Sequence, residues 1–110
     1  MIDKNKQRYI YFARPIGGDG RIKIGCSYNP AKRLVALASW SAYPIEIIAV
    51  AAGGFADEKM LHQFFADDRL HCEWFRASDD LHFVIEAMSR ARLSASDAIA
   101  ALPSRRKAAA

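Results

Sequence analysis

Residues 8–25 decide the fold, and they read RYIYFARPIGGDGRIKIG. The first part, Arg8 to Ala13, is rich in β-branched and aromatic residues, which favours a strand. Residues 15–20 contain a proline and three glycines and predict a turn. Residues 21–25 alternate polar and apolar side chains, which indicates a second strand. The stretch therefore predicts a β-hairpin.

Alternation gives this hairpin one apolar and one polar face. Successive side chains of a strand point to opposite faces, so Ile10 and Phe12 share one face and Ile22 and Ile24 complete it. We expect that face to be buried. The opposite face should then display Tyr9, Tyr11 and Lys23 together.

Capping signals predict the helix that follows. Asn29 is a favoured N-cap residue, and Pro30 suits the first helical position. We expect this helix to run to about Ser39, with Arg33 in its first turn. Its inward residues should be Leu34, Val35, Leu37 and Ala38.

The rest of the chain predicts one more strand and three helices. Residues 44–51 favour a mostly buried strand, and residues 56–65 favour a helix on which Glu58 and His62 lie one turn apart. Residues 67–77 read as a polar segment anchored by Glu73-Trp74-Phe75. Capping residues then predict a helix from Ser78 to about Arg92 and a short one after Ser94, followed by a mobile basic tail.

Length and composition indicate one small globular domain. The chain has 110 residues, of which 52% are apolar and 25% charged, and no apolar run approaches the ~20 residues of a membrane span. The charged N-terminus is followed by no apolar stretch, which argues against a secretory signal. Cys26 and Cys72 lack paired spacing, so we expect neither a disulfide framework nor a zinc site. These features favour a cytoplasmic protein.

Basic charge concentrates in the first part of the chain. Residues 1–41 hold eight basic and two acidic residues, whereas residues 42–110 hold eight basic and ten acidic residues. A basic face suits a nucleic-acid backbone, although a solvated charged surface explains the same counts.

Four residues suit phosphodiester hydrolysis. The reaction needs an activated water and stabilisation of charge on the phosphate, which a hydrated Mg²⁺ and Arg or Lys side chains can supply. The predicted hairpin and helix bring Tyr11, Lys23 and Arg33 close together, and Glu58 on the next helix is a candidate metal ligand. Taken singly, each of these residues has an ordinary structural explanation.

The order of these residues resembles the GIY-YIG nuclease superfamily. The resemblance covers roughly residues 8–90 and rests on Tyr9-Ile10-Tyr11, Lys23-Ile24-Gly25, Arg33, the Glu58/His62 pair and Glu73-Trp74-Phe75. The Lys-Ile-Gly form is similar to a phage and prophage branch that includes domains of the meiotically up-regulated gene type. The resemblance implies an α+β fold with a small three-stranded, mainly antiparallel sheet flanked by helices. The nuclease-like domain would span residues 1–93, with a short helix and tail at 94–110.

The resemblance also implies roles for individual residues. Tyr11 would be the general base or would orient the attacking water, Lys23 would assist it or contact phosphate, and Arg33 would stabilise the transition state. Glu58 would bind a single Mg²⁺ or Mn²⁺, and His62 is a further candidate for substrate contact or for assisting the base. Substrate contacts are expected from Tyr9, Ser27 and Lys32.

Two departures from that pattern leave the function open. Tyr9 stands where the superfamily's first-motif glycine lies, and the C-terminal asparagine of many members has no clear match. The leading hypothesis is a metal-dependent endonuclease acting on DNA, as a monomer or homodimer. The alternatives are a non-catalytic nucleic-acid-binding module and a scaffold that binds a protein partner.

Overall fold

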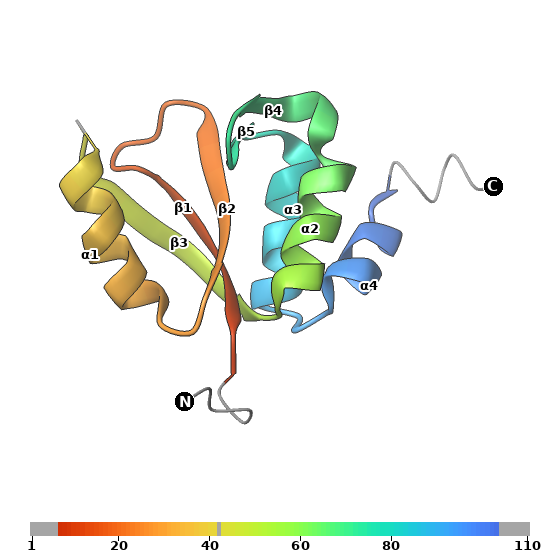
Figure 1. The fold of residues 1–110 in the computed structure, drawn as a ribbon. Helices are drawn as coiled ribbons and strands as arrows, with labels where there is room; N and C mark the ends of the chain where they lie inside the picture. Colours follow the sequence, from red (N-terminus) through yellow and green to blue (C-terminus); the bar gives the residue numbers. More distant parts are fainter. Residues whose placement is uncertain (1–6, 42, 104–110) are drawn as a thin grey trace.

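Five antiparallel strands form one sheet in the order β3-β1-β2-β5-β4. The computed structural model describes residues 7–41 and 43–103, and the predicted tail at 104–110 lies outside them. The elements follow one another along the chain as β1 (Tyr9–Pro15), β2 (Arg21–Ser27), α1 (Pro30–Trp40), β3 (Ile45–Ala52), α2 (Phe55–Phe64), a 3₁₀ turn η1 (Ala66–Asp68), β4 (Arg69–His71), β5 (Trp74–Arg76), α3 (Asp79–Ser89) and α4 (Ala95–Ala100). Figure 1 shows α1 on one side of the sheet and the other three α-helices grouped on the opposite side.

The predicted three-stranded sheet is wrong, because β4 and β5 extend it to five strands. Each is three residues long, too short for alternation to reveal. The turn between them has Cys72 at a φ of 51°, a conformation that glycine usually supplies. The Arg69 Nε–H donates to the Cys72 carbonyl at 2.6 Å and fastens this turn. The segment read as polar is therefore a small hairpin paired with β2.

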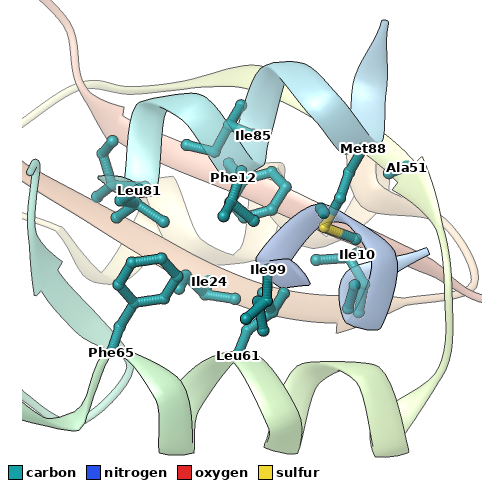
Figure 2. Close-up of a cluster of buried hydrophobic side chains, with 14 of the residues drawn as sticks. Ile10, Phe12, Ile24, Ala51, Leu61, Phe65, Leu81, Ile85, Met88 and Ile99 are labelled. Carbon is teal, nitrogen blue, oxygen red and sulfur yellow. The ribbon is translucent and has the colours of Figure 1, made fainter. Parts of the chain in front are cut away.

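The apolar face of the first hairpin forms the core, as its alternation predicts. Ile10, Phe12, Ile22 and Ile24 are buried. Side chains from α2, α3 and α4, and from Phe65 at the C-cap of α2, join them in one core, including Val84 and Ala98. Figure 2 labels Leu61, Phe65, Leu81, Ile85, Met88 and Ile99 of this set. The short helix α4 is thus packed into the same core as the sheet.

The other face of β1 is buried as well, which differs from the expectation. Tyr11 is 2% exposed and Lys23 is 7% exposed, so neither is displayed at the surface. Tyr9, by contrast, is half-buried. Alternation could assign Tyr11 and Lys23 to one face, but it could not show that later segments cover that face.

Helix α1 starts as predicted, but it is packed more loosely than expected. The Asn29 side chain caps it by accepting from the Lys32 N–H at 3.1 Å, and Pro30 is its first residue. None of its residues is buried, and Val35 is 72% exposed. The inward placement of Val35 and Ala38 was wrong because α1 lies mainly against β3, an edge strand, which covers only Leu34 and Leu37 in part. The predicted burial of β3 was also too high, since most of its residues are half-buried.

No helix within residues 7–41 and 43–103 has the length and apolarity needed to cross a bilayer.

Replacing Phe12 by alanine tests the position of the core. Phe12 is fully buried, so Phe12→Ala should lower the free energy of unfolding by about 3–5 kcal/mol. Val35→Ala removes an exposed apolar side chain and should change it by less than about 0.5 kcal/mol. Urea unfolding measures both; equal losses would contradict the peripheral position of α1.

Candidate functional site

The Tyr11 ring lies against Gly25 on the neighbouring strand. The two residues are directly paired in the β1–β2 ladder. A Cβ atom added at Gly25 would come within 2.3 Å of both Cζ and Oη of Tyr11. Only glycine leaves this space, so Gly25 has a packing reason to follow Lys23 and Ile24 in the sequence.

The Tyr11 hydroxyl reaches Arg33, in the first turn of α1. Burial raises the pKa of Tyr11 above its ordinary 10.0, and the hydrogen bond from Arg33 offsets this only in part. The carboxylates Glu73 and Glu58 raise the pKa further. Tyr11 is therefore a neutral phenol at pH 7, able to donate and accept hydrogen bonds.

Lys23 forms a part-buried ion pair with Glu73. Its Nζ lies 2.7 Å from Glu73 Oε2, and the Lys23 side chain is 9% exposed. The pairing of β2 with β5 brings them together, and next to this pairing the Ile24 N–H donates to the Glu73 carbonyl at 3.0 Å. A buried ammonium needs such a partner, so Glu73 holds Lys23 charged and in place.

Glu58 lies in the first turn of α2, near Glu73. Burial raises the pKa of Glu58 above 4.5, and the Glu73 carboxylate raises it further. His62 and Lys23 act in the opposite direction. A bound cation would relieve the unfavourable effect of the Glu73 carboxylate on the ionised form of Glu58.

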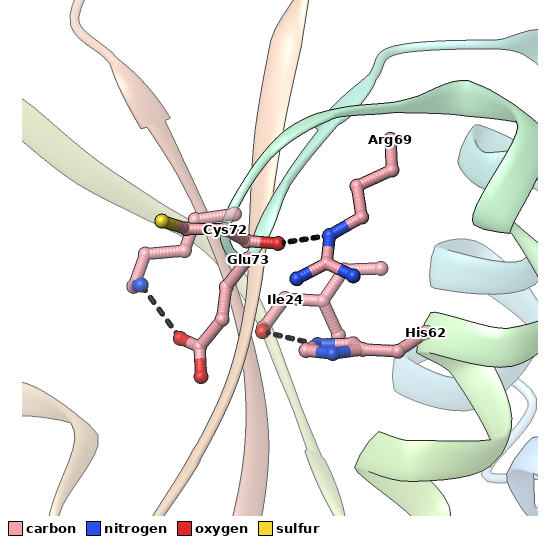
Figure 3. A network of polar contacts seen from close by, with 6 residues as sticks. Ile24, His62, Arg69, Cys72 and Glu73 are labelled. Carbon is pink, nitrogen blue, oxygen red and sulfur yellow. Dashed lines mark hydrogen bonds and ion pairs between the residues drawn. The ribbon is translucent and has the colours of Figure 1, made fainter.

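His62 fastens α2 to the sheet. Its Nε2 lies 2.9 Å from the Ile24 carbonyl, which can only accept, so Nε2 carries the proton (Figure 3). The imidazole also packs on Phe75, with ring centroids 5.0 Å apart. The β2–β5 pairing covers Arg21 to Lys23 of β2. The hydrogen bond of His62 to the Ile24 carbonyl therefore lies one residue beyond the end of that pairing.

A cavity of about 390 Å³ joins these groups. It is lined by Arg8, Tyr11, Cys26, Ser27, Tyr28, Arg33, Phe55, Glu58 and Glu73. A neighbouring hollow of about 330 Å³ is lined by Ser27, Tyr28, Asn29, Lys32, Arg33 and Ala36. A larger hollow between β3 and α3 contains a single charged side chain, Arg92, and no carboxylate.

The structure thus brings together Tyr11, Arg33, Glu58 and Ser27 from the predicted site. Lys23 reaches them through Glu73, and Lys32 lies in the neighbouring hollow. His62 and Tyr9 are not among the residues that line either space.

The sequence prediction missed five residues of this cavity. They are Arg8, Cys26, Tyr28, Phe55 and Glu73. Glu73 stood in the recognised Glu73-Trp74-Phe75 anchor, but without β5 nothing placed its carboxylate opposite Lys23. Arg8 counted only as one basic residue among several.

The carboxylate pair fits a hydrated magnesium ion. Within the described part of the chain no group of three His, Cys, Asp or Glu residues could hold a metal. Magnesium is usually bound by one or two carboxylates together with waters and substrate phosphates. Glu58 and Glu73 line one cavity, so the donor set suits this ion; Cys26 is the single thiol among the lining residues and no histidine lines the cavity, which is less than a structural zinc site needs.

Comparison with known proteins assigns the family. A model of the T5orf172 domain matches residues 8–92, and no curated protein or solved structure matches the chain. The matched region covers most of the sequence, so the chain belongs to the T5orf172 domain family. This family is associated with nucleic acids.

The assignment to the GIY-YIG superfamily was wrong, because the matching family is a different one. The motifs behind it have local structural reasons that do not distinguish families. Gly25 gives Tyr11 its space, and Asn29-Pro30 starts a helix.

A methyl group at position 25 should disrupt the Tyr11 packing. Gly25→Ala should lower the free energy of unfolding by roughly 1–3 kcal/mol, because the ring would have to move out of its place. The control is Gly54→Ser, where an added Cβ meets nothing within 4 Å and serine is a favoured N-cap. Urea unfolding compares the two variants, and an unaffected Gly25→Ala would refute the close contact.

The raised pKa of Glu58 predicts a pH dependence of stability. Below pH 4.5 the carboxyl is protonated in both states; as pH rises from there through the folded-state pKa, the unfolded state ionises first and stability falls. Glu58→Gln should therefore raise the melting temperature relative to wild type at pH 7 and not at pH 4. Thermal unfolding at a series of pH values without divalent ions measures this. Parallel curves for the two proteins would contradict it.

Proposed function

We propose that this member of the T5orf172 domain family is a metal-dependent endonuclease that hydrolyses phosphodiester bonds in DNA. The family's association with nucleic acids supports the substrate class. The observation that carries the proposal is the meeting of Glu58, Glu73, Arg33 and Tyr11 in one cavity. They provide carboxylates for a cation, a guanidinium for phosphate and a hydroxyl that can orient water.

Glu58 is the proposed ligand of a single Mg²⁺ or Mn²⁺ ion, with Glu73 as the nearby second carboxylate. When bound, this ion would neutralise phosphate charge and lower the pKa of a coordinated water. The raised pKa of Glu58 gives the free site a reason to take up a cation, because the cation relieves the unfavourable interaction with Glu73.

Arg33 is the proposed phosphate-binding group. It lies in the exposed first turn of α1, lines both neighbouring hollows, and is held by its hydrogen bond to Tyr11. A guanidinium carries five N–H donors, so Arg33 can contact Tyr11 and still bind phosphate oxygens. It would stabilise the negative charge that develops in the transition state.

Tyr11 and Lys23 are assigned supporting roles in the reaction. A neutral Tyr11 orients the attacking water rather than removing its proton, because burial keeps the phenol protonated at pH 7. Lys23 holds the Glu73 carboxylate in place at the cavity and offsets its charge beside the phosphate.

The remaining predicted residues surround this centre. His62 positions α2, and thereby Glu58, through its bond to Ile24. Ser27 and Lys32 line the hollow next to Arg33, where the substrate backbone would continue, and Tyr9 flanks Tyr11 on β1. We place the activity in the cytoplasm because Cys26 and Cys72 are free thiols. One site cuts one strand, so a monomer would nick duplex DNA and a homodimer could cut both strands.

A non-catalytic nucleic-acid-binding module is the second candidate. The Lys23–Glu73 ion pair favours it, because this pair already satisfies one of the two carboxylates without a metal. Salt-dependent DNA binding without cleavage in Mg²⁺ or Mn²⁺ would identify this function.

Nicking of supercoiled plasmid tests the catalytic proposal. With Mg²⁺ or Mn²⁺ the wild type should convert plasmid to the open circle, and Glu58→Gln should slow this by about 10²-fold or more because it removes the metal ligand. The matched control is Glu86→Gln on α3, whose side chain is 68% exposed and whose residue does not line the cavity. Equal nicking by Glu58→Gln and Glu86→Gln, or none by wild type, would rule out catalysis at this site.

Arg33 should matter for turnover more than for folding. Arg33→Met keeps an apolar stem on an exposed helix position but removes the guanidinium, so nicking should fall by about 10²-fold or more. The melting temperature should change little, since no residue of α1 is buried. Wild-type nicking rates in this variant would exclude Arg33 from the site.

A further inference from the structure

Arg8 contacts two aromatic rings at the side of the cavity. Its guanidinium carbon lies 4.3 Å from the centroid of the Tyr28 ring and 4.4 Å from that of Phe55. All three residues line the cavity that contains Glu58 and Arg33. Contact of a guanidinium with aromatic rings is favourable, and two such contacts help to hold the side chain in place.

The three residues come from separate segments that the backbone fixes in place. Arg8 directly precedes β1, and its carbonyl accepts from the Gly53 N–H at 3.3 Å. Phe55 follows two residues later as the first residue of α2. Tyr28 stands before α1, next to Asn29, whose N–H donates to Ser27 Oγ at 3.0 Å. The arrangement is therefore set by the fold rather than by one flexible loop.

Arg8 packs on two aromatic rings, and its guanidinium carries five N–H donors that can serve a ligand in the cavity. Among the ion pairs of the described residues, none involves Arg8. A planar fork of this kind matches the oxygens of a phosphate.

We propose that Arg8, positioned by its contacts with the Tyr28 and Phe55 rings, binds a second DNA phosphate next to the one that is cleaved. This inference rests on the proposed function, because it takes Glu58 and Arg33 to mark the position of the scissile phosphate. A rigid second contact would fix the register of the backbone in the cavity without reading its sequence. It would thereby hold the scissile bond against the catalytic groups.

Binding without cleavage tests this contact. The inactive Glu58→Gln protein is titrated, without divalent ions, against a fluorescent duplex over a series of salt concentrations. The additional change Arg8→Met should weaken binding several-fold and reduce the slope of log K against log salt by about 0.9, the value for one phosphate contact. Arg8→Lys should keep most of the slope but bind more weakly than arginine, because it lacks the planar fork. Arg90→Met, at the C-cap of α3 with its side chain 82% exposed, is the control.

A scan with single methylphosphonate linkages locates the contact. Neutralising one phosphate beside the cleavage position should weaken binding of the protein that retains Arg8, and Arg8→Met should be insensitive at that linkage alone. The proposal is overturned if Arg8→Met matches Arg90→Met in affinity and slope. The proposal is also overturned if Arg8→Met and the protein that retains Arg8 respond alike to every neutral linkage and differ only on DNA with an abasic position. In that case Phe55 would be stacking on a base. Circular dichroism and melting curves establish that each variant is folded.

The outcomes separate this inference from the catalytic proposal. If wild type binds DNA through Arg8 as described but never nicks plasmid, the phosphate contact stands and catalysis fails. If wild type nicks and Arg8→Met binds and nicks equally well, catalysis stands and the Arg8 contact is wrong.

Discussion

The contact between the Tyr11 ring and the bare backbone of Gly25 is the constraint on which the rest of the site depends. The ring occupies the space of a side chain at position 25, so Tyr11 lies flat across β2 instead of pointing away from the sheet. In this position its hydroxyl meets Arg33 of α1 and lies in the cavity with Glu58 and Glu73. Strand β1 is therefore buried on both faces: one face packs in the core, and the other carries Tyr11 into the cavity.

Charge in the cavity is balanced before any ligand arrives. Lys23 neutralises Glu73, Arg33 is bound to a neutral phenol, and Glu58 is left with a raised pKa in a partly buried place. Such prearranged charges need little reorganisation during a reaction, which is why they stabilise transition states more effectively than water does. The same arrangement has a thermodynamic cost in the free protein, because Glu58 is less favourably ionised there than in solvent.

Local sequence signals predicted the parts of this structure that have local causes. Alternation identified the core face through Ile10, Phe12, Ile22 and Ile24, and Asn29-Pro30 located the start of α1. The β4–β5 hairpin was missed because its turn has Cys72 in a left-handed conformation, and the sequence has no glycine at that position to predict a turn. The partner of Lys23 is Glu73, 50 residues further along the chain, and only the sheet pairing could reveal it. Motif order predicted a nucleic-acid-associated domain but the wrong family.

Both backbone groups of Ile24 are taken by the elements that carry the two carboxylates. Its N–H holds the Glu73 carbonyl on one side, and its carbonyl holds His62, one turn beyond Glu58, on the other. Hydrogen bonds to a single residue of β2 therefore set the distance between Glu58 and Glu73, and the lengths of the loops that connect these elements do not. Insertions or deletions in those loops can accumulate while the distance between the two carboxylates stays the same.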